Sequence, residues 1–123
     1  MGKRVLVVDD EPNIVMSLEF LMRRAGFEVQ VARNGREALD ALEGAAPDLL
    51  LLDVMMPEFD GYEVCERVRA RPEWNGTKIV MLTARGREVE RERGLALGAD
   101  AYVTKPFSTR DLVDKVKHML GAA

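Results

Sequence analysis

The sequence predicts one α/β domain in which five parallel strands form an open sheet with helices on both faces. Short apolar runs alternate with longer segments whose apolar residues recur every three or four positions, a pattern typical of repeated strand and helix units. One run, Leu49 to Leu52, consists of four leucines and indicates a strand buried on both faces. Strands joined by helical crossovers must be parallel, and right-handed crossovers cover both faces of the sheet.

Five apolar runs predict the strands, at residues 5–8, 27–32, 49–52, 79–82 and 101–103. The first helix is expected to begin at Pro12 and to end before Gly26, because proline favours the first turn and glycine the position after the last. A short second helix passes through residues 38–42, and a third, through residues 64–68, ends near Arg71 and Pro72.

A fourth, charge-dense helix is expected from about Arg87 to Leu97, ending at Gly98, and a last helix carries an apolar stripe over residues 112–120. The fourth helix has a thin apolar stripe and an internal glycine, Gly94. Both features weaken a helix, so we expect this segment to be among the less stable and to exchange its amide hydrogens readily.

The composition fits one domain that spans residues 1–123. With 47% hydrophobic and 32% charged residues, a chain of 123 residues can bury one core. The 21 acidic and 18 basic residues are mixed along the chain and leave a net charge of −3, which argues against direct binding of nucleic acid or of an anionic membrane. One cysteine, with neither a signal-peptide pattern nor a membrane-spanning apolar run, predicts a cytoplasmic protein.

Polar residues with chemical potential follow four of the predicted strands. Asp9 and Asp10 follow the first, Asp53 the third, Thr83 the fourth, and Lys105 comes soon after the fifth. Ligands of open parallel sheets bind at the carboxyl ends of the strands, so these five side chains are expected to share one site.

Three carboxylates gathered at one edge repel one another and require a cation. Mg²⁺ is the expected ion, because it takes oxygen ligands and typically binds one or two carboxylates together with a phosphate, whereas zinc prefers nitrogen and sulfur. Asp53, held between a cation and the ammonium of Lys105, is then suited to act as a nucleophile toward phosphorus. Thr83 would donate its hydroxyl to another oxygen of the transferred group.

Five sequence runs together match a known pattern: Val7 to Glu11, Leu52 to Pro57, Asp60-Gly61, Leu82 to Ala84 and Gly98 to Phe107. They resemble the receiver domains of two-component response regulators, which have the CheY-like, flavodoxin-like fold. The resemblance covers essentially the whole chain. It implies a doubly wound sheet with strand order 2-1-3-4-5 and five helices.

The resemblance also implies a role for each residue of the site. Asp53 would accept a phosphoryl group, and Asp9, Asp10, Asp53 and the backbone carbonyl of Met55 would bind Mg²⁺. Thr83 and Lys105 would hold the phosphoryl group.

As a switch, Thr83 would shift toward the phosphate and Tyr102 would turn inward, which remodels the face made by the fourth helix, the fifth strand and the fifth helix. The Lys105-Pro106 bond would be cis.

The implied partners are a sensor histidine kinase or phosphotransfer protein, a downstream effector protein or domain, and a second copy in a phosphorylation-dependent homodimer. Such a protein catalyses phosphoryl transfer to its own aspartate and dephosphorylates slowly, and is not an enzyme with an external product. Receivers joined to winged-helix domains usually have two acids before the aromatic residue of the fifth strand. Here Ala101 follows Asp100, which argues against their salt-bridged dimer.

Two other functions remain open at this point. A small Mg²⁺-dependent phosphohydrolase of the haloacid dehalogenase type also uses an aspartate nucleophile, but Met55 stands where it would need a second aspartate. A receiver-like interaction module that is never phosphorylated is the other alternative.

Single residues also allow simpler interpretations. Asp10 could serve simply as a helix cap. Tyr102 could be an ordinary half-buried aromatic residue on an edge strand. We expect Cys65 to pack as a small hydrophobic residue, His118 to lie on the surface, and Trp74 to anchor a loop.

Overall fold

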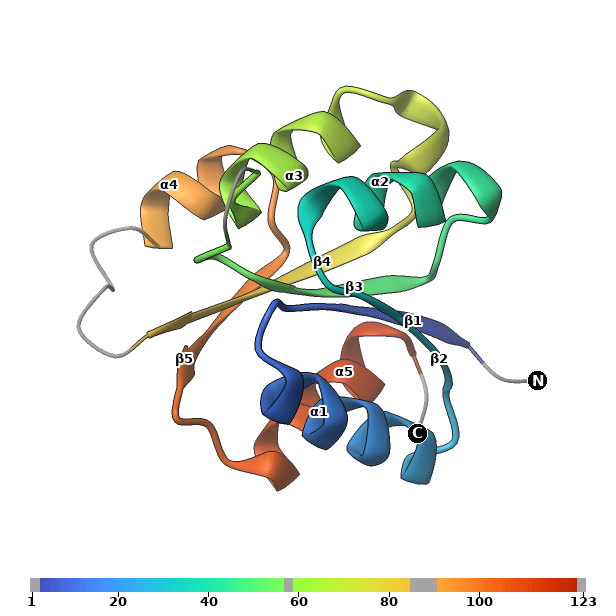
Figure 1. Ribbon diagram of the computed structural model, residues 1–123, viewed down its shortest axis with the longest axis vertical. Coiled ribbons are helices and arrows are strands. Elements are labelled where there is room, and N and C mark those ends of the chain that lie inside the picture. Colours follow the sequence, from blue (N-terminus) through green and yellow to red (C-terminus); the bar gives the residue numbers. More distant parts are fainter. Residues whose placement is uncertain (1–2, 57–58, 85–90, 122–123) are drawn as a thin grey trace.

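Five parallel strands form one sheet, in the order β2-β1-β3-β4-β5 (Figure 1). The computed structural model describes residues 3–56, 59–84 and 91–121. Its strands are β1 (Arg4–Val8), β2 (Glu28–Ala32), β3 (Leu49–Asp53), β4 (Lys78–Ala84) and β5 (Ala101–Lys105). The predicted fold class and strand order are therefore confirmed.

Helices cover both faces of the sheet. Figure 1 shows α2, α3 and α4 on one face and α1 and α5 on the other. The bounds in the described residues are α1 (Pro12–Arg24), α2 (Gly35–Gly44), α3 (Gly61–Arg69), the short 3-10 helix η1 (Pro72–Trp74), α4 (Arg91–Ala96) and α5 (Thr109–Met119). None of the helices in these residues is long and apolar enough to cross a membrane.

The leucine run forms the centre of the sheet. All four leucines of β3 are fully buried, since Leu50 and Leu52 pack beneath α2 and α3 while Leu49 and Leu51 face the core shared with α1 and α5. β3 pairs with β1 on one side and with β4 on the other. The apolar faces of the helices and the unbroken leucine run thus fix which strand is central.

Local signals set the helix ends. Pro12 occupies the first turn of α1, as predicted, and Gly26 follows this helix with φ of 99°, a conformation that favours glycine. The side chains of Asn34, Asp60 and Ser108 cap α2, α3 and α5 by accepting hydrogen bonds from backbone N–H groups.

Several element bounds differ from those predicted. β4 extends past Thr83 to Ala84 and β5 extends to Lys105, because the pairing of these two strands continues beyond their apolar runs. α3 already ends at Arg69, and α5 ends at Met119. Residues 87–90 of the expected charged helix lie outside the described residues, so its predicted low stability stays a prediction.

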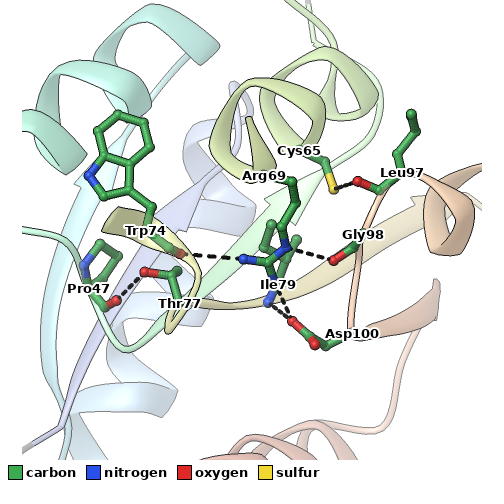
Figure 2. A network of polar contacts seen from close by, with 9 residues as sticks. All are labelled: Pro47, Cys65, Arg69, Trp74, Thr77, Ile79, Leu97, Gly98 and Asp100. Carbon is green, nitrogen blue, oxygen red and sulfur yellow. Dashed lines mark hydrogen bonds and ion pairs between the residues drawn. The ribbon is translucent and has the colours of Figure 1, made fainter. Parts of the chain in front are cut away.

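Near the amino-terminal ends of β4 and β5, Arg69 links four segments (Figure 2). They are α3, η1, the loop between α4 and β5, and, through Asp100, strand β4. Its guanidinium forms an ion pair of 2.7 Å with Asp100 and donates hydrogen bonds to the backbone carbonyls of Gly98 and Trp74. The same oxygen of Asp100 accepts a hydrogen bond of 2.8 Å from the backbone N–H of Ile79. The carboxyl ends of α3 and α4 are thereby tied to the start of the sheet.

Replacing Arg69 by methionine should lower the free energy of unfolding by about 2 to 3 kcal/mol, because Asp100 and two carbonyls lose a partly buried partner. Urea unfolding followed by circular dichroism measures this value. Arg23→Met is the matched control: Arg23 forms an exposed ion pair with Glu19 and should contribute less than about 0.5 kcal/mol. Equal effects of the two variants would contradict the importance assigned to Arg69.

Candidate functional site

The site lies where the sheet changes winding direction, at the carboxyl ends of β1 and β3. Asp9 directly follows β1, and Asp53 is the last residue of β3 rather than the residue after it. β1 pairs with β2 on one side and β3 on the other, so chain connections leave this point in opposite directions. Open α/β sheets bind their ligands at such positions.

Three carboxylates meet here, as predicted. One oxygen from each of Asp9, Asp10 and Asp53 lies within 4.8 Å of the other two. Asp9 is 1% and Asp53 6% exposed, whereas Asp10 is exposed. Two buried negative groups and a third at the rim form a set of hard oxygen donors that could hold a divalent cation.

Lys105, the last residue of β5, reaches two of these carboxylates. Its Nζ lies 3.2 Å from Oδ1 of Asp53 and 3.3 Å from Oδ2 of Asp9. Burial acts against the charge of Lys105, yet the carboxylates of Asp53 and Asp9 raise the pKa of its ammonium. Lys105 therefore remains a cation at neutral pH, and it shares one positive charge between two acids.

The single ammonium of Lys105 does not neutralise the negative charge of the three carboxylates. Burial raises the pKa of Asp53 from 3.8 to about 6; the charge of Asp9 adds to the rise, and Lys105 opposes it. The net direction shows that desolvation and repulsion outweigh the ion pair. Asp53 is nevertheless mainly ionised above pH 7, as a nucleophilic carboxylate must be.

Thr83 supplies a buried hydroxyl beside Asp53. Asp53 pairs with Leu82 in the sheet, so Thr83 lies one residue further along β4. Its side chain is fully buried, and Oγ1 has no hydrogen-bond partner among the residues that the structure describes. A buried hydroxyl without a partner is costly, which is consistent with a group kept for a ligand.

The backbone after Asp53 turns sharply toward α3. The N–H of Gly61 donates a 2.8 Å hydrogen bond to the carbonyl of Val54. A Cβ at Gly61 would stand 2.5 Å from the Asp53 carbonyl oxygen and 2.8 Å from Cα of Val54. The φ of Gly61 is not positive, so this position requires a residue without a Cβ for the close approach between α3 and β3, not for backbone freedom.

Met55 lies in the same turn with a side chain that is 54% exposed. The role of its carbonyl as a metal ligand stays a prediction. Pro57, the last residue of that sequence run, lies outside the described residues. The Lys105-Pro106 peptide bond is cis, as the resemblance implies.

The simple capping interpretation of Asp10 finds no support in the geometry. Glu11 occupies the cap position of α1 without a side-chain capping bond. Oδ1 of Asp9 accepts a 3.0 Å hydrogen bond from the Glu11 N–H, so Asp9 is the acid that orders this turn. Asp10 is left with its carboxylate beside those of Asp9 and Asp53.

Tyr102 lies on the edge strand β5. Its hydroxyl oxygen is 3.3 Å from that of Tyr62 on α3, a residue that sequence reasoning missed. Hydrophobic periodicity carries no signal for such a contact, because Tyr62 follows Asp60 and Gly61 in the first turn of a helix and reads simply as a core residue.

The remaining predicted residues lie where expected. Cys65 is fully buried, and burial raises the pKa of its thiol to about 11, which makes it unreactive. His118 is exposed on α5. Trp74 is 6% exposed and packs in the core beneath η1, with the Arg71 guanidinium 4.2 Å above its ring.

Comparison with known families gives one match that spans most of the chain. The model of the response regulator receiver domain matches residues 5–117. This range includes all the predicted site residues.

Solved structures agree with this match. A response regulator chain from Chloroflexus aurantiacus J-10-fl is 40% identical, with a TM-score of 0.94 over 98% of this chain and 99% of the other. The receiver domain of a signal transduction histidine kinase from Syntrophus aciditrophicus is 33% identical, with a TM-score of 0.91 and coverage of 98% and 91%. The chemotaxis protein CheY4 of Vibrio cholerae is 33% identical, with a TM-score of 0.90 and coverage of 97% and 99%.

The raised pKa of Asp53 predicts a stability that falls as pH rises. The folded protein holds this proton until about pH 6, whereas the unfolded chain releases it near pH 3.8, so ionisation costs stability across that interval and the full cost applies above it. In EDTA, Asp53→Asn should therefore be more stable than the wild type by about 1 to 3 kcal/mol at pH 7.5 and by much less at pH 4.

Urea unfolding of both proteins at the two pH values measures the difference. Asp48→Asn is a matched control, because the Asp48 carboxylate accepts a hydrogen bond from the Arg4 N–H at the opposite edge of the sheet and should not gain stability. A loss of stability in Asp53→Asn at pH 7.5 would show that the ion pair with Lys105 outweighs burial.

Proposed function

The chain belongs to the response regulator receiver domain family, and we propose that it is a phosphoacceptor switch in which Asp53 receives a phosphoryl group from a histidine kinase or phosphotransfer protein. The observation that carries this proposal is the placement of Asp53. It is a buried carboxylate with an ammonium at 3.2 Å, two further carboxylates close by and, on the next strand, a hydroxyl without a partner among the described residues.

The residues present fit a bound Mg²⁺. The cluster combines two buried acids and one exposed acid with a single ammonium, so a divalent cation would remove the repulsion that raises the pKa of Asp53. Asp9, Asp10, Asp53 and the backbone carbonyl of Met55 would hold the ion. When bound, Mg²⁺ supplies Lewis-acid neutralisation of charge on the transferred group.

Transfer is a displacement at phosphorus. A carboxylate oxygen of Asp53 forms the new O–P bond, and the bond between phosphorus and the donor, nitrogen in phosphohistidine or oxygen in acetyl phosphate, breaks with its electron pair going to the donor. Lys105 remains protonated through the reaction, so its ammonium can pair with a phosphoryl oxygen instead of an acid. Thr83 donates its buried hydroxyl to another phosphoryl oxygen.

By analogy with other phosphorylated residues, the phosphorylated side chain carries a charge of about −1.5 to −2. The unmodified Asp53 carboxylate carries at most one negative charge at the same position, so phosphorylation makes the site more negative. This change biases the equilibrium between two arrangements of the face formed by α4, β5 and α5. That face would then control a downstream effector protein or domain, or pair two copies of the chain. The protein would work in the cytoplasm, without turnover of an external substrate.

The first test is incubation with Mg²⁺ and acetyl phosphate, followed by intact-protein mass spectrometry. The proposal predicts a stable gain of one phosphoryl group, which Asp53→Asn abolishes and EDTA prevents. Repeated release of inorganic phosphate without accumulation would indicate a phosphohydrolase instead. Absence of any modification would indicate a receiver-like module that acts without phosphorylation.

The metal site has its own test. Asp10→Asn should weaken Mg²⁺ binding about tenfold or more in isothermal titration, because it removes a carboxylate from the cluster. The fold should be unaffected, since Asp10 is exposed. Glu11→Gln is the matched control, being an adjacent exposed acid outside the cluster. If both variants bound Mg²⁺ equally well, Asp10 would not be a ligand.

A further inference from the structure

The chain's two tyrosines contact each other across the α3–β5 side of the molecule. Tyr62 in the first turn of α3 is 3% exposed, and its hydroxyl oxygen lies 3.3 Å from that of Tyr102 on β5. Either hydroxyl can donate. The contact links the helix that follows the Asp53 turn to the edge strand of the sheet.

Helix α4 leaves room for the ring of Tyr102. A Cβ at Gly94 would stand 3.2 Å from Cε2 of Tyr102 and 2.9 Å from Sδ of Met81. Met81 is the sheet partner of Tyr102, so the ring lies over β4 and against the backbone of α4. Because Gly94 has no side chain, Tyr102 can pack against the core beneath α3 and α4.

The ring of Tyr62 is itself held by α4. The guanidinium carbon of Arg93 lies 4.3 Å from the centre of this ring, in cation–π geometry. Arg93 precedes Gly94, so adjacent residues of α4 contact the two tyrosines. The rings of Tyr62 and Tyr102, called here the tyrosine pair, therefore both pack against α4.

Tyr102 lies on the same face of the sheet as Thr83, whose hydroxyl is proposed to bind the phosphoryl group. Met81 and Thr83 are two residues apart on β4 and thus share one face of the sheet, and they pair with Tyr102 and Thr104 respectively. Tyr102 packs against the core beneath α3 and α4, and in this inward position its hydroxyl contacts that of Tyr62.

We propose that Tyr62 is a positioning residue of the switch: its hydroxyl holds Tyr102 inward in the unphosphorylated protein. The inference rests on the proposed function and deepens it. Phosphorylation then acts on a β5 already close to its final arrangement, and less of the phosphoryl binding energy is used to move Tyr102. Loss of the hydroxyl lowers the inward population, and apparent affinity for a phosphoryl mimic falls in proportion to that population.

The test uses Tyr62→Phe, which keeps the ring beneath Arg93 and removes only the hydroxyl. With 3-fluorotyrosine, the wild type gives two fluorine resonances and this variant gives one, that of Tyr102. In metal-free protein, this resonance should move toward the position of an exposed tyrosine. With Mg²⁺ and beryllofluoride it should return, at an apparent Kd about three to ten times that of the wild type.

Two further variants separate positioning from a general loss of structure. Tyr62 has contacts besides the one with Tyr102, so Tyr102→Phe and the double variant are also needed. If the contact between the two hydroxyls is responsible, the double variant should weaken beryllofluoride binding no more than Tyr62→Phe alone. Gly94→Ala should displace the Tyr102 ring from α4 and shift its resonance in the same direction while Tyr62 is intact.

An unchanged Tyr102 resonance in metal-free Tyr62→Phe overturns the inference, and so do fully additive effects in the double variant. Failure of the proposed function is a separate result: the wild type would then take up neither beryllofluoride nor a phosphoryl group at Asp53. In that case the metal-free resonance still decides whether Tyr62 holds Tyr102.

Discussion

One ammonium group, that of Lys105, faces two buried carboxylates, those of Asp9 and Asp53, at distances of 3.3 and 3.2 Å. Charge balance cannot be reached by these three groups alone, and Asp10 at the rim adds a further negative charge. Burial and repulsion therefore raise the pKa of Asp53 despite its ion pair. Added positive charge would relieve this repulsion, which is why we propose that a divalent cation binds here.

The packing of the rest of the fold holds these mutually repelling carboxylates together at the carboxyl ends of β1 and β3. β3 carries Asp53 at the end of four fully buried leucines, so its position is fixed by packing on both faces. At the opposite edge, Arg69 ties the ends of α3 and α4 to Asp100 and the start of β4, and thus leaves the Asp100 carboxylate engaged within the chain. The amino-terminal ends of β4 and β5 are thus anchored, whereas the carboxyl ends of β1 and β3 carry an electrostatic cost that the proposed cation would relieve.

Most of the fold and of the acid site could be predicted from the sequence. Strand runs that end in Asp, Thr and Lys place those residues at one edge as soon as the strands are known to be parallel, because topology alone brings their ends together. The predicted strands stopped one residue short of Asp53 and two residues short of Lys105, and both residues lie within their strands. Apolar periodicity does not extend into polar residues, although the backbone pairing does.

What the sequence could not predict depends on side-chain direction between distant elements. Tyr62 and Tyr102 are 40 positions apart, and Arg69 and Asp100 are 31 apart, so neither contact is encoded in a local pattern. Gly61 and Gly94 are similar cases. Because these glycines have no side chain, α3 can approach β3 closely and α4 can approach the Tyr102 ring. No local sequence pattern indicates either contact.

We expect Asp53 to remain an uncompensated buried carboxylate until a cation enters. The most direct measurement is a pH titration of the Asp53 carboxyl carbon by NMR, without metal and with saturating Mg²⁺. Its pKa should be near 6 in the metal-free protein and markedly lower with Mg²⁺. A pKa near the ordinary value of 3.8 in both conditions would show instead that Lys105 alone balances the site.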